Sequence, residues 1–238
     1  MKPKQRTPPP APKIGPGQIL ARAANAVPDF AMAGVYLLAW GAPHRLGVSH
    51  LTGLVLLMLL EFINIHSSAF MGDVLSRDKS RFRVPVALAL PAKIGSVVAL
   101  GVFYTLFVGG FSFIFKVWWP VGAFWLLTLN RLLVLLPARG SSKETQDAVQ
   151  RGWGAAVGCY ILALFAGMAA PAWGITAEVR QALDLPGGGL WVEHPQAALA
   201  AGFLYFGCMG LSDLFDHRWI MPGVGMGSGY RAAGRYGT

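Results

Sequence analysis

Long apolar runs, separated by short segments that carry most of the charge, are the feature that most constrains this chain. A helix needs about 20 apolar residues to cross the roughly 30 Å hydrocarbon core of a bilayer. The sequence contains several runs of this length and one shorter run, residues 30–42. Only 13% of the residues are charged, which is about half the fraction usual in soluble domains. The sequence therefore predicts an all-α fold, a polytopic bundle of transmembrane helices.

We expect six spans within residues 28–219. They are placed at residues 30–42, 48–75, 94–115, 117–136, 153–176 and 195–212. The first is short enough that it could instead be buried or re-entrant. Pro28 is expected to open the first span, and Pro91 to mark a bend before the third. Ala198 and Gly202 form a small-xxx-small pair, which favours close packing of helices.

The basic residues indicate how the chain is oriented in the membrane. With six spans, the cytoplasmic segments hold fifteen lysine and arginine residues and the outer loops hold three. An excess of basic residues is typical of cytoplasmic loops. Without a crossing at residues 30–42, the basic N-terminus would face outside. We therefore expect both termini in the cytoplasm and the bundle in a bacterial inner membrane, and we interpret the net charge of +9 as a topology signal, with no nucleic-acid partner.

The two ends of the chain differ in composition from the bundle. Residues 1–27 are basic and rich in proline, and their last part, 18–27, fits a short amphipathic helix on the membrane surface. Residues 220–238 are basic and rich in glycine, and we expect this cytoplasmic tail to be disordered on its own. Between the last two spans, residues 177–196 are expected to form a surface helix, a glycine turn and an aromatic anchor.

The second expected span carries the most informative polar residues, in the segment LEFINIHSSAFMGD. Glu61, Asn64 and Ser68 are spaced i, i+3, i+7 and should share one helix face. Charged side chains in a bilayer face the bundle interior or a cavity, so we expect Glu61 to lie near Arg131 of the fourth span and Lys93 of the third. A buried ion pair or a protonated Glu61 that fixes the helix register is the first interpretation. A proton relay or a substrate contact is the alternative.

His66 lies on a different face of the same helix, in line with Phe62 and Phe70. No second histidine is expected at a matching depth, which argues against a haem held between two histidines of this chain. We expect His66 to form a hydrogen bond with Ser67, a nearby main-chain carbonyl or a neighbouring helix. The alternative is a single axial ligand to a haem or a (bacterio)chlorophyll, and the sequence leaves any further cofactor unknown.

Three polar residues close the sixth span, and two cysteines lie in apolar runs. Asp213, Asp216 and His217 share a helix face, but their spacing matches no metal motif. We interpret them as a solvated cytoplasmic helix end and expect no metal site. Cys159 and Cys208 show none of the spacing of a disulfide framework, and we interpret both as small packing residues.

The sequence contains no phosphate-binding loop, serine-hydrolase elbow or zinc-protease motif, and we expect no catalytic residues. Our first hypothesis is a non-catalytic accessory or scaffolding subunit of a larger membrane complex, one that contacts bound lipid and other membrane subunits. If that complex converts energy and contains a pigment or a haem, we expect His66 or the aromatic surface to contact a pigment, a haem, a quinone or a lipid. One alternative is a small transporter or channel-like protein that uses Glu61, Asn64 and Arg131. The other is a membrane enzyme that acts on lipid or quinone at the cytoplasmic face.

Overall fold

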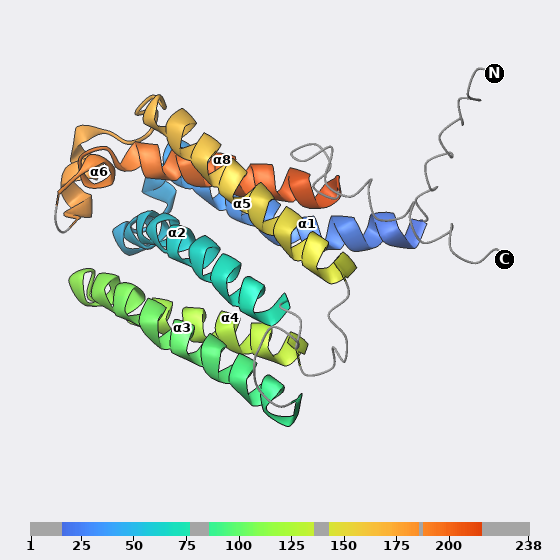
Figure 1. Cartoon of the computed structure of the whole chain (residues 1–238). Helices are drawn as coiled ribbons and strands as arrows, with labels where there is room; N and C mark the ends of the chain where they lie inside the picture. Colours follow the sequence, from blue (N-terminus) through green and yellow to red (C-terminus); the bar gives the residue numbers. More distant parts are fainter. Residues whose placement is uncertain (1–15, 77–85, 136–142, 186–187, 216–238) are drawn as a thin grey trace, which may run out of the picture.

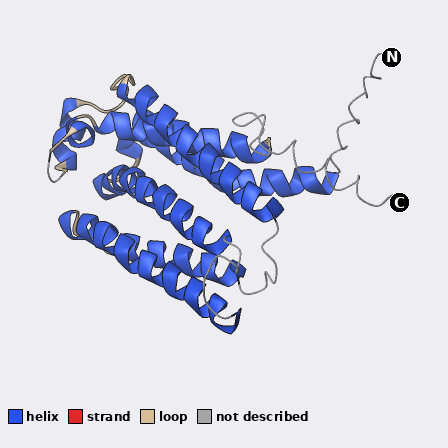
Figure 2. Cartoon of the chain, in the orientation of Figure 1, coloured by secondary structure: helices blue, strands red, loops and turns tan. Residues whose placement is uncertain are grey.

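The computed structural model of the chain describes residues 16–76, 86–135, 143–185 and 188–215. Every regular element in these ranges is a helix (Figure 2). The elements are α1 (Pro16–Gly41), the 3₁₀ helix η1 (Pro43–Arg45), α2 (Val48–Ser76), α3 (Val86–Ile114), α4 (Trp119–Leu135), α5 (Lys143–Met168), α6 (Ala177–Leu183), α7 (Leu190–Glu193) and α8 (Pro195–Leu214). The predicted all-α class is confirmed for the described ranges.

Four of these helices are long and apolar enough to cross a membrane. The candidate spans are Val48–Met71 in α2, Leu90–Ile114 in α3, Gln150–Met168 in α5 and Pro195–Leu214 in α8. Large apolar side chains point outward from them, and Leu162 and Phe165 of α5 are 67% and 70% exposed. Contiguous apolar surface of this kind is unfavourable in water and is compatible with lipid. The composition and the surface of these helices are those expected of a membrane protein.

Helix α2 lies between two groups of helices (Figure 1). On one side α8 packs between α1 and α5, and on the other side α3 and α4 pack together against α2. The buried side chains of α2 divide in the same way. Leu54 and Met58 belong to the core shared with α1, α5 and α8, whereas Leu60 and Ile63 belong to the core shared with α3 and α4. Residues of α2 therefore contribute to both hydrophobic cores.

Helix α8 packs closely against its two neighbours because its buried face is made of small residues. That face includes Ala197, Ala198, Ala200, Ala201 and Gly202. A Cβ atom at Gly202 would overlap the ring of Tyr36 in α1, and one at Gly167 of α5 would lie 2.6 Å from the carbonyl oxygen of Ala197. The close packing predicted from the Ala198 and Gly202 pair is confirmed on the α1 side.

Helix α1 is a single helix where two segments are expected. The sequence predicts a surface helix at 18–27 and a span at 30–42, but α1 runs through both ranges with Pro28 inside it. A proline removes one main-chain hydrogen bond from a helix interior. Ala26 and Tyr36, on either side of this proline, are both buried. Packing of the flanking turns favours one continuous helix despite the lost bond.

Helix α5 ends earlier than predicted, at Met168 rather than at residue 176. The chain then turns so that Gly174 contacts the end of α1, where a Cβ atom at Gly174 would lie 2.5 Å from the carbonyl oxygen of Gly41. The Gly174 N–H also donates to the Trp40 carbonyl oxygen (3.2 Å). This contact lies between segments far apart in the sequence, so the apolar run alone could not predict it.

The connection between α5 and α8 contains the predicted parts. Thr176 caps α6, since its hydroxyl oxygen accepts a hydrogen bond from the Val179 N–H (3.4 Å). Gly189 has a φ of 110°, a conformation that favours glycine. The short helix α7 follows and carries Trp191, which packs against the core of α1, α5 and α8. The helix and the glycine turn are therefore confirmed, and the role of Trp191 as a membrane anchor stays a prediction.

Candidate functional site

Three tyrosines from three different helices donate hydrogen bonds to one side of α2. The Tyr36 hydroxyl of α1 donates to the Leu54 carbonyl oxygen (2.8 Å), and the Tyr160 hydroxyl of α5 donates to the Met58 carbonyl oxygen (2.9 Å). The Tyr205 hydroxyl of α8 donates to Oε2 of Glu61 (3.4 Å). The three acceptor residues are spaced i, i+4, i+7 along α2 and share one face. Each hydroxyl is thereby satisfied inside an apolar bundle, where an unpaired polar group is costly.

Glu61 lies where the tyrosine interface meets a small cavity. Beyond its hydrogen bond with Tyr205, it interacts electrostatically with Tyr36 and Tyr160. A cavity of about 50 Å³ lies on the side of α2 that faces α3 and α4, and Glu61 and Asn64 both line it. A cavity needs about 10–15 Å³ to hold a water molecule. Glu61 therefore lies between packed helices and beside a cavity large enough for water.

Asn64 and Ser68 are joined through the main chain of α2. The hydroxyls of Ser68 (2.6 Å) and Ser67 (2.9 Å) both donate to the Asn64 carbonyl oxygen. Local bonds of this kind satisfy a serine hydroxyl within its own helix. The cavity is lined by Glu61 and Asn64 but not by Ser68. The structure thus brings together two of the three residues that the spacing places on one face.

The two basic residues expected near Glu61 are described to different extents. Lys93 of α3 is buried, with 8% of its surface exposed. Arg131 belongs to α4, but its side chain lies outside the described part of the structure. The pairing of Glu61 with Arg131 therefore stays a prediction.

His66 lies on the outer surface of α2. Its Nδ1 is 3.0 Å from the Phe62 carbonyl oxygen, and its ring centroid is 4.2 Å from that of Phe62. Phe62 and Phe70 are 50% and 55% exposed, and His66 between them is exposed as well. The predicted alignment of the three residues and a bond to a nearby main-chain carbonyl are confirmed.

Of the polar residues at the end of the sixth span, the structure describes only Asp213. Asp216 and His217 lie outside the described residues. The carboxylates of Asp213 in α8 and Asp29 in α1 lie close enough to repel each other. Sequence reasoning missed Asp29 because its partner belongs to the far end of the chain. Among the described residues, no group of three histidine, cysteine or acidic side chains could hold a metal ion.

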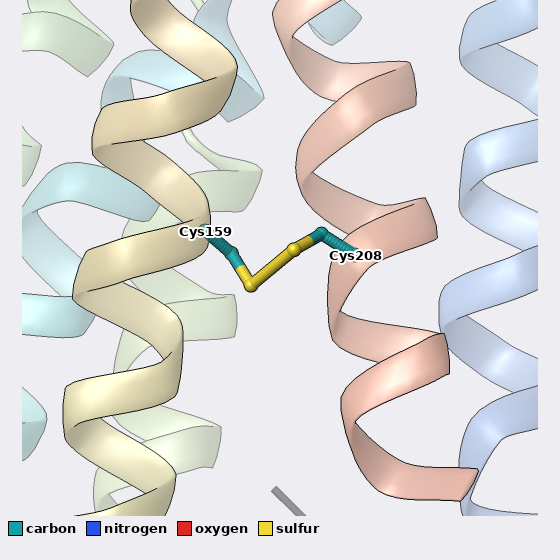
Figure 3. Close-up of a disulfide and its surroundings, with 2 residues drawn as sticks. All are labelled: Cys159 and Cys208. Atoms are coloured by element: carbon teal, nitrogen blue, oxygen red, sulfur yellow. A yellow bond between two sulfur atoms is a disulfide. The ribbon is translucent and has the colours of Figure 1, made fainter. Parts of the chain in front are cut away.

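A disulfide joins Cys159 of α5 to Cys208 of α8 (Figure 3). Their Cα atoms are 5.9 Å apart, within the usual range of about 4.4–6.8 Å. The interpretation of both cysteines as unlinked packing residues is therefore wrong. Their separation of 49 residues matches no short cysteine motif, and only the packing of α5 against α8 brings the two together.

Sequence reasoning also missed the three tyrosines, although a signal for them exists. Tyr36, Tyr160 and Tyr205 each lie within an apolar run, where a hydroxyl must find a partner inside the protein. That rule identifies residues that need an acceptor. It does not indicate which helix provides the acceptor, so it could not have predicted their common contact with α2.

A larger cavity lies at the C-terminal end of α3. Its volume is about 450 Å³, and it is lined by Leu59 of α2, by Phe111, Ile114 and Phe115, and by residues 188–192. This volume is within the range of small-molecule sites, roughly 300–1,000 Å³. The side chains that line it are apolar.

No protein family, curated protein or solved structure matches this chain.

Proposed function

We propose that this chain is a non-catalytic accessory or scaffolding subunit of a larger membrane complex. The observation that carries the proposal is the outer surface of α2, where His66 is exposed between Phe62 and Phe70. Polar residues within transmembrane helices rarely face lipid, and they face other protein segments or cavities instead. A partner subunit that covers this surface would remove the imidazole from contact with hydrocarbon.

The packing of the bundle is consistent with a static scaffold. The disulfide links α5 to α8, and the tyrosine hydrogen bonds link α1, α5 and α8 to α2. Gly202 and Gly167 bring α1 and α5 into close contact with α8. Helices held by several independent contacts are expected to move little relative to one another.

The proposal includes six crossings, with both termini in the cytoplasm of a bacterial inner membrane. Two observations support the crossings beyond the four candidate spans. Helix α1 runs along α8 in the opposite direction (Figure 1), and Trp40 at its end donates through Nε1 to the Pro171 carbonyl oxygen (2.9 Å). Helix α4 pairs with α3, and its 17 residues are close to the length of about 20 that a span requires.

Bound lipid belongs to the same proposal. The cavity of about 450 Å³ is lined by Leu59, by the end of α3 and by Trp191. It lies beside the spans, where acyl chains are the surrounding solvent, and tryptophan favours the membrane interface. A lipid acyl chain fits both its position and its apolar lining.

Site-specific photo-crosslinking in cells tests the accessory-subunit proposal. A photoreactive phenylalanine analogue replaces Phe70, and the matched control replaces Phe107, which is 49% exposed on α3. We expect a discrete protein adduct from position 70 and only lipid adducts from position 107. The adduct should migrate with this chain in a native gel after gentle detergent extraction. Lipid adducts alone from position 70, with a monomeric protein in the native gel, would overturn the proposal.

The cavity beside Glu61 and Asn64 favours a second candidate, a small transporter or channel-like protein. Water in that cavity would give Glu61 a route for exchange of a proton or a cation. The test is a flux assay in liposomes with the wild-type protein and Glu61→Gln. We expect flux that this variant abolishes, whereas equal leak from both proteins excludes the candidate.

A further inference from the structure

The hydrogen bond of His66 determines which of its ring nitrogens is available. A carbonyl oxygen only accepts, so Nδ1, which lies 3.0 Å from the Phe62 carbonyl oxygen, carries the hydrogen. In the neutral ring, Nε2 then holds a lone pair. Within the described ranges Nε2 has no hydrogen-bond partner. A lone pair of this kind in hydrocarbon is unfavourable, and a hydrogen-bond donor or a metal would stabilise it.

Metal-bound histidines often make the same kind of hydrogen bond as His66. Those residues commonly donate from the second ring nitrogen to a main-chain carbonyl, which fixes the tautomer and the ring orientation and raises the basicity of the ligating nitrogen. His66 lies five residues before Met71, the end of the candidate span, or about 8 Å along a helix with a rise of 1.5 Å per residue. Charged groups are costly at such depths. A bare metal ion is therefore unfavourable at this position, and we expect the metal to be bound within a membrane-soluble molecule.

Exposed aromatic side chains lie on α2 and α5 near the level of His66. The ring centroids of Phe62 and Tyr160 are 6.1 Å apart, which sets the register of the two helices. Because α2 and α5 run in opposite directions (Figure 1), Trp153, seven residues before Tyr160, falls near the level of Phe70. Trp153 and Phe70 are 42% and 55% exposed. Flat, exposed rings at this level of α2 and α5 would pack well against a planar macrocycle.

We propose that Nε2 of His66 is the axial ligand of a metallo-tetrapyrrole, a haem or a chlorin, that lies against the outer surface of α2 and α5. The inference rests on the proposed function, because the macrocycle would fill the interface between this subunit and its partner. Ligation by one protein histidine is an established mode for haem. The hydrogen bond from Nδ1 to the Phe62 carbonyl oxygen orients the ring, and Phe62 and Phe70 lie about one turn before and after His66 on the same helix face.

The test uses the full-length chain in lipid nanodiscs, titrated separately with iron protoporphyrin IX and with a zinc chlorin. We expect saturable, equimolar binding of one probe, accompanied by a shift of its Soret band. His66→Gly removes the ligand itself, so it should weaken binding by more than the roughly 10- to 100-fold that loss of an outer-shell partner costs. Added imidazole should restore the band in that variant by entering the space left by the side chain, a rescue that a purely structural role of His66 would not give. His50→Gly is the matched control, because His50 is exposed at the opposite end of α2.

The outcomes separate this inference from the proposed function. Binding of the iron probe alone would identify a haem site, and binding of the zinc probe alone a chlorin site. Equal binding to wild type and His66→Gly, a loss caused by His50→Gly, or no saturable binding of either probe would overturn the inference. A protein adduct from position 70 without any probe binding would mean that a side chain of the partner contacts His66. In that case the proposed function stands and the tetrapyrrole is rejected.

Discussion

At the scale of single residues, the hydroxyls of three buried tyrosines are satisfied across helices, whereas several serine and threonine hydroxyls bond within their own helices. Three tyrosines, one each from α1, α5 and α8, contact successive turns of α2. Two of them donate to main-chain carbonyls, which already accept bonds within the helix, and the third donates to Glu61. A hydrogen bond in a membrane interior contributes only modestly, because the separated helices also find partners for their polar groups. The contribution of each tyrosine should therefore be measurable but small.

Tyr160→Phe removes one hydroxyl and changes nothing else in the ring. We expect it to lower the free energy of unfolding by about 0.5–1 kcal/mol, because the Met58 carbonyl loses a buried donor at 2.9 Å. Unfolding in a titration of mixed detergent micelles measures the change. Tyr104→Phe is the control, since the Tyr104 ring is buried but its hydroxyl has no hydrogen-bond partner among the described residues. An equal loss in both variants would show that the Tyr160 hydrogen bond is not the cause.

The sequence predicts the positions of single residues well where the argument involves only one helix. Glu61 and Asn64 line the same cavity, and His66 aligns with Phe62 and Phe70, because helical spacing determines both results. The tyrosine donors, the Asp29 contact and the disulfide each join segments distant in the chain. Hydropathy contains no information on which segments meet, so these contacts required the structure.

At the scale of elements, hydropathy predicts where helices lie, and packing determines where they end. The second and sixth spans closely match α2 and α8. The first and fifth do not, because α1 continues through Pro28 and α5 stops where Gly174 meets Gly41. The contact between α1 and α8 also depends on backbone approach, since Gly202 leaves space for the ring of Tyr36.

Gly202→Ala should destabilise the bundle by about 1–3 kcal/mol, because the added methyl overlaps Tyr36 and forces α1 away from α8. Gly207→Ala in the same helix is the matched control, because a Cβ atom there meets nothing within 4 Å. We expect the control to be neutral or slightly stabilising, as alanine favours a helix by up to about 1 kcal/mol over glycine. Thermal aggregation in detergent compares the two variants. Equal melting temperatures would show that α1 and α8 are not in close contact.

The disulfide between α5 and α8 can be tested without an assay of function. The chain has only two cysteines, so a polyethylene-glycol maleimide added after denaturation reports directly on their state. We expect no labelling before reduction and two labels after it. Cys159→Ser should give one label without reduction, as a control for access of the reagent. Two labels on the unreduced wild-type protein would show that the thiols are free.

At the scale of the whole molecule, the central place of α2 could not be predicted from the sequence. A helix in water shows its buried side as an apolar face, but in lipid both sides are apolar and the pattern is lost. In α2, residues on opposite sides join different cores, and the sequence between Val48 and Met71 is apolar throughout except for a few polar positions. Basic residues and loop lengths therefore predict topology better than they predict which helices are neighbours.

The last prediction concerns how many times the chain crosses the membrane. Single cysteines at Arg45, Lys116, Lys143 and Arg180, in a Cys159→Ser, Cys208→Ser background, are exposed to an impermeant maleimide on intact cells. Six crossings place the first, second and fourth positions outside and Lys143 inside, so Lys143→Cys should be labelled only after permeabilisation. The structure supports placing Arg45, Lys116 and Arg180 on one side. The end of α3 and residues 188–192 line one cavity, and α6 contacts α2.

If only the four candidate spans cross, the four cysteines are distributed differently between the two sides of the membrane. Arg45, Lys116 and Lys143 would then share one side of the membrane, and Arg180 would lie on the other. The two topologies therefore differ in whether Arg180→Cys reacts together with Lys116→Cys or opposite to it. Reaction together, with Lys143→Cys protected, requires that α4 crosses as well. A fifth cysteine, at Lys13, tests α1 in the same way. Protection of Lys13→Cys on intact cells, together with reaction of Arg45→Cys, would show that α1 crosses and that the basic N-terminal segment is cytoplasmic, as the distribution of charge predicts.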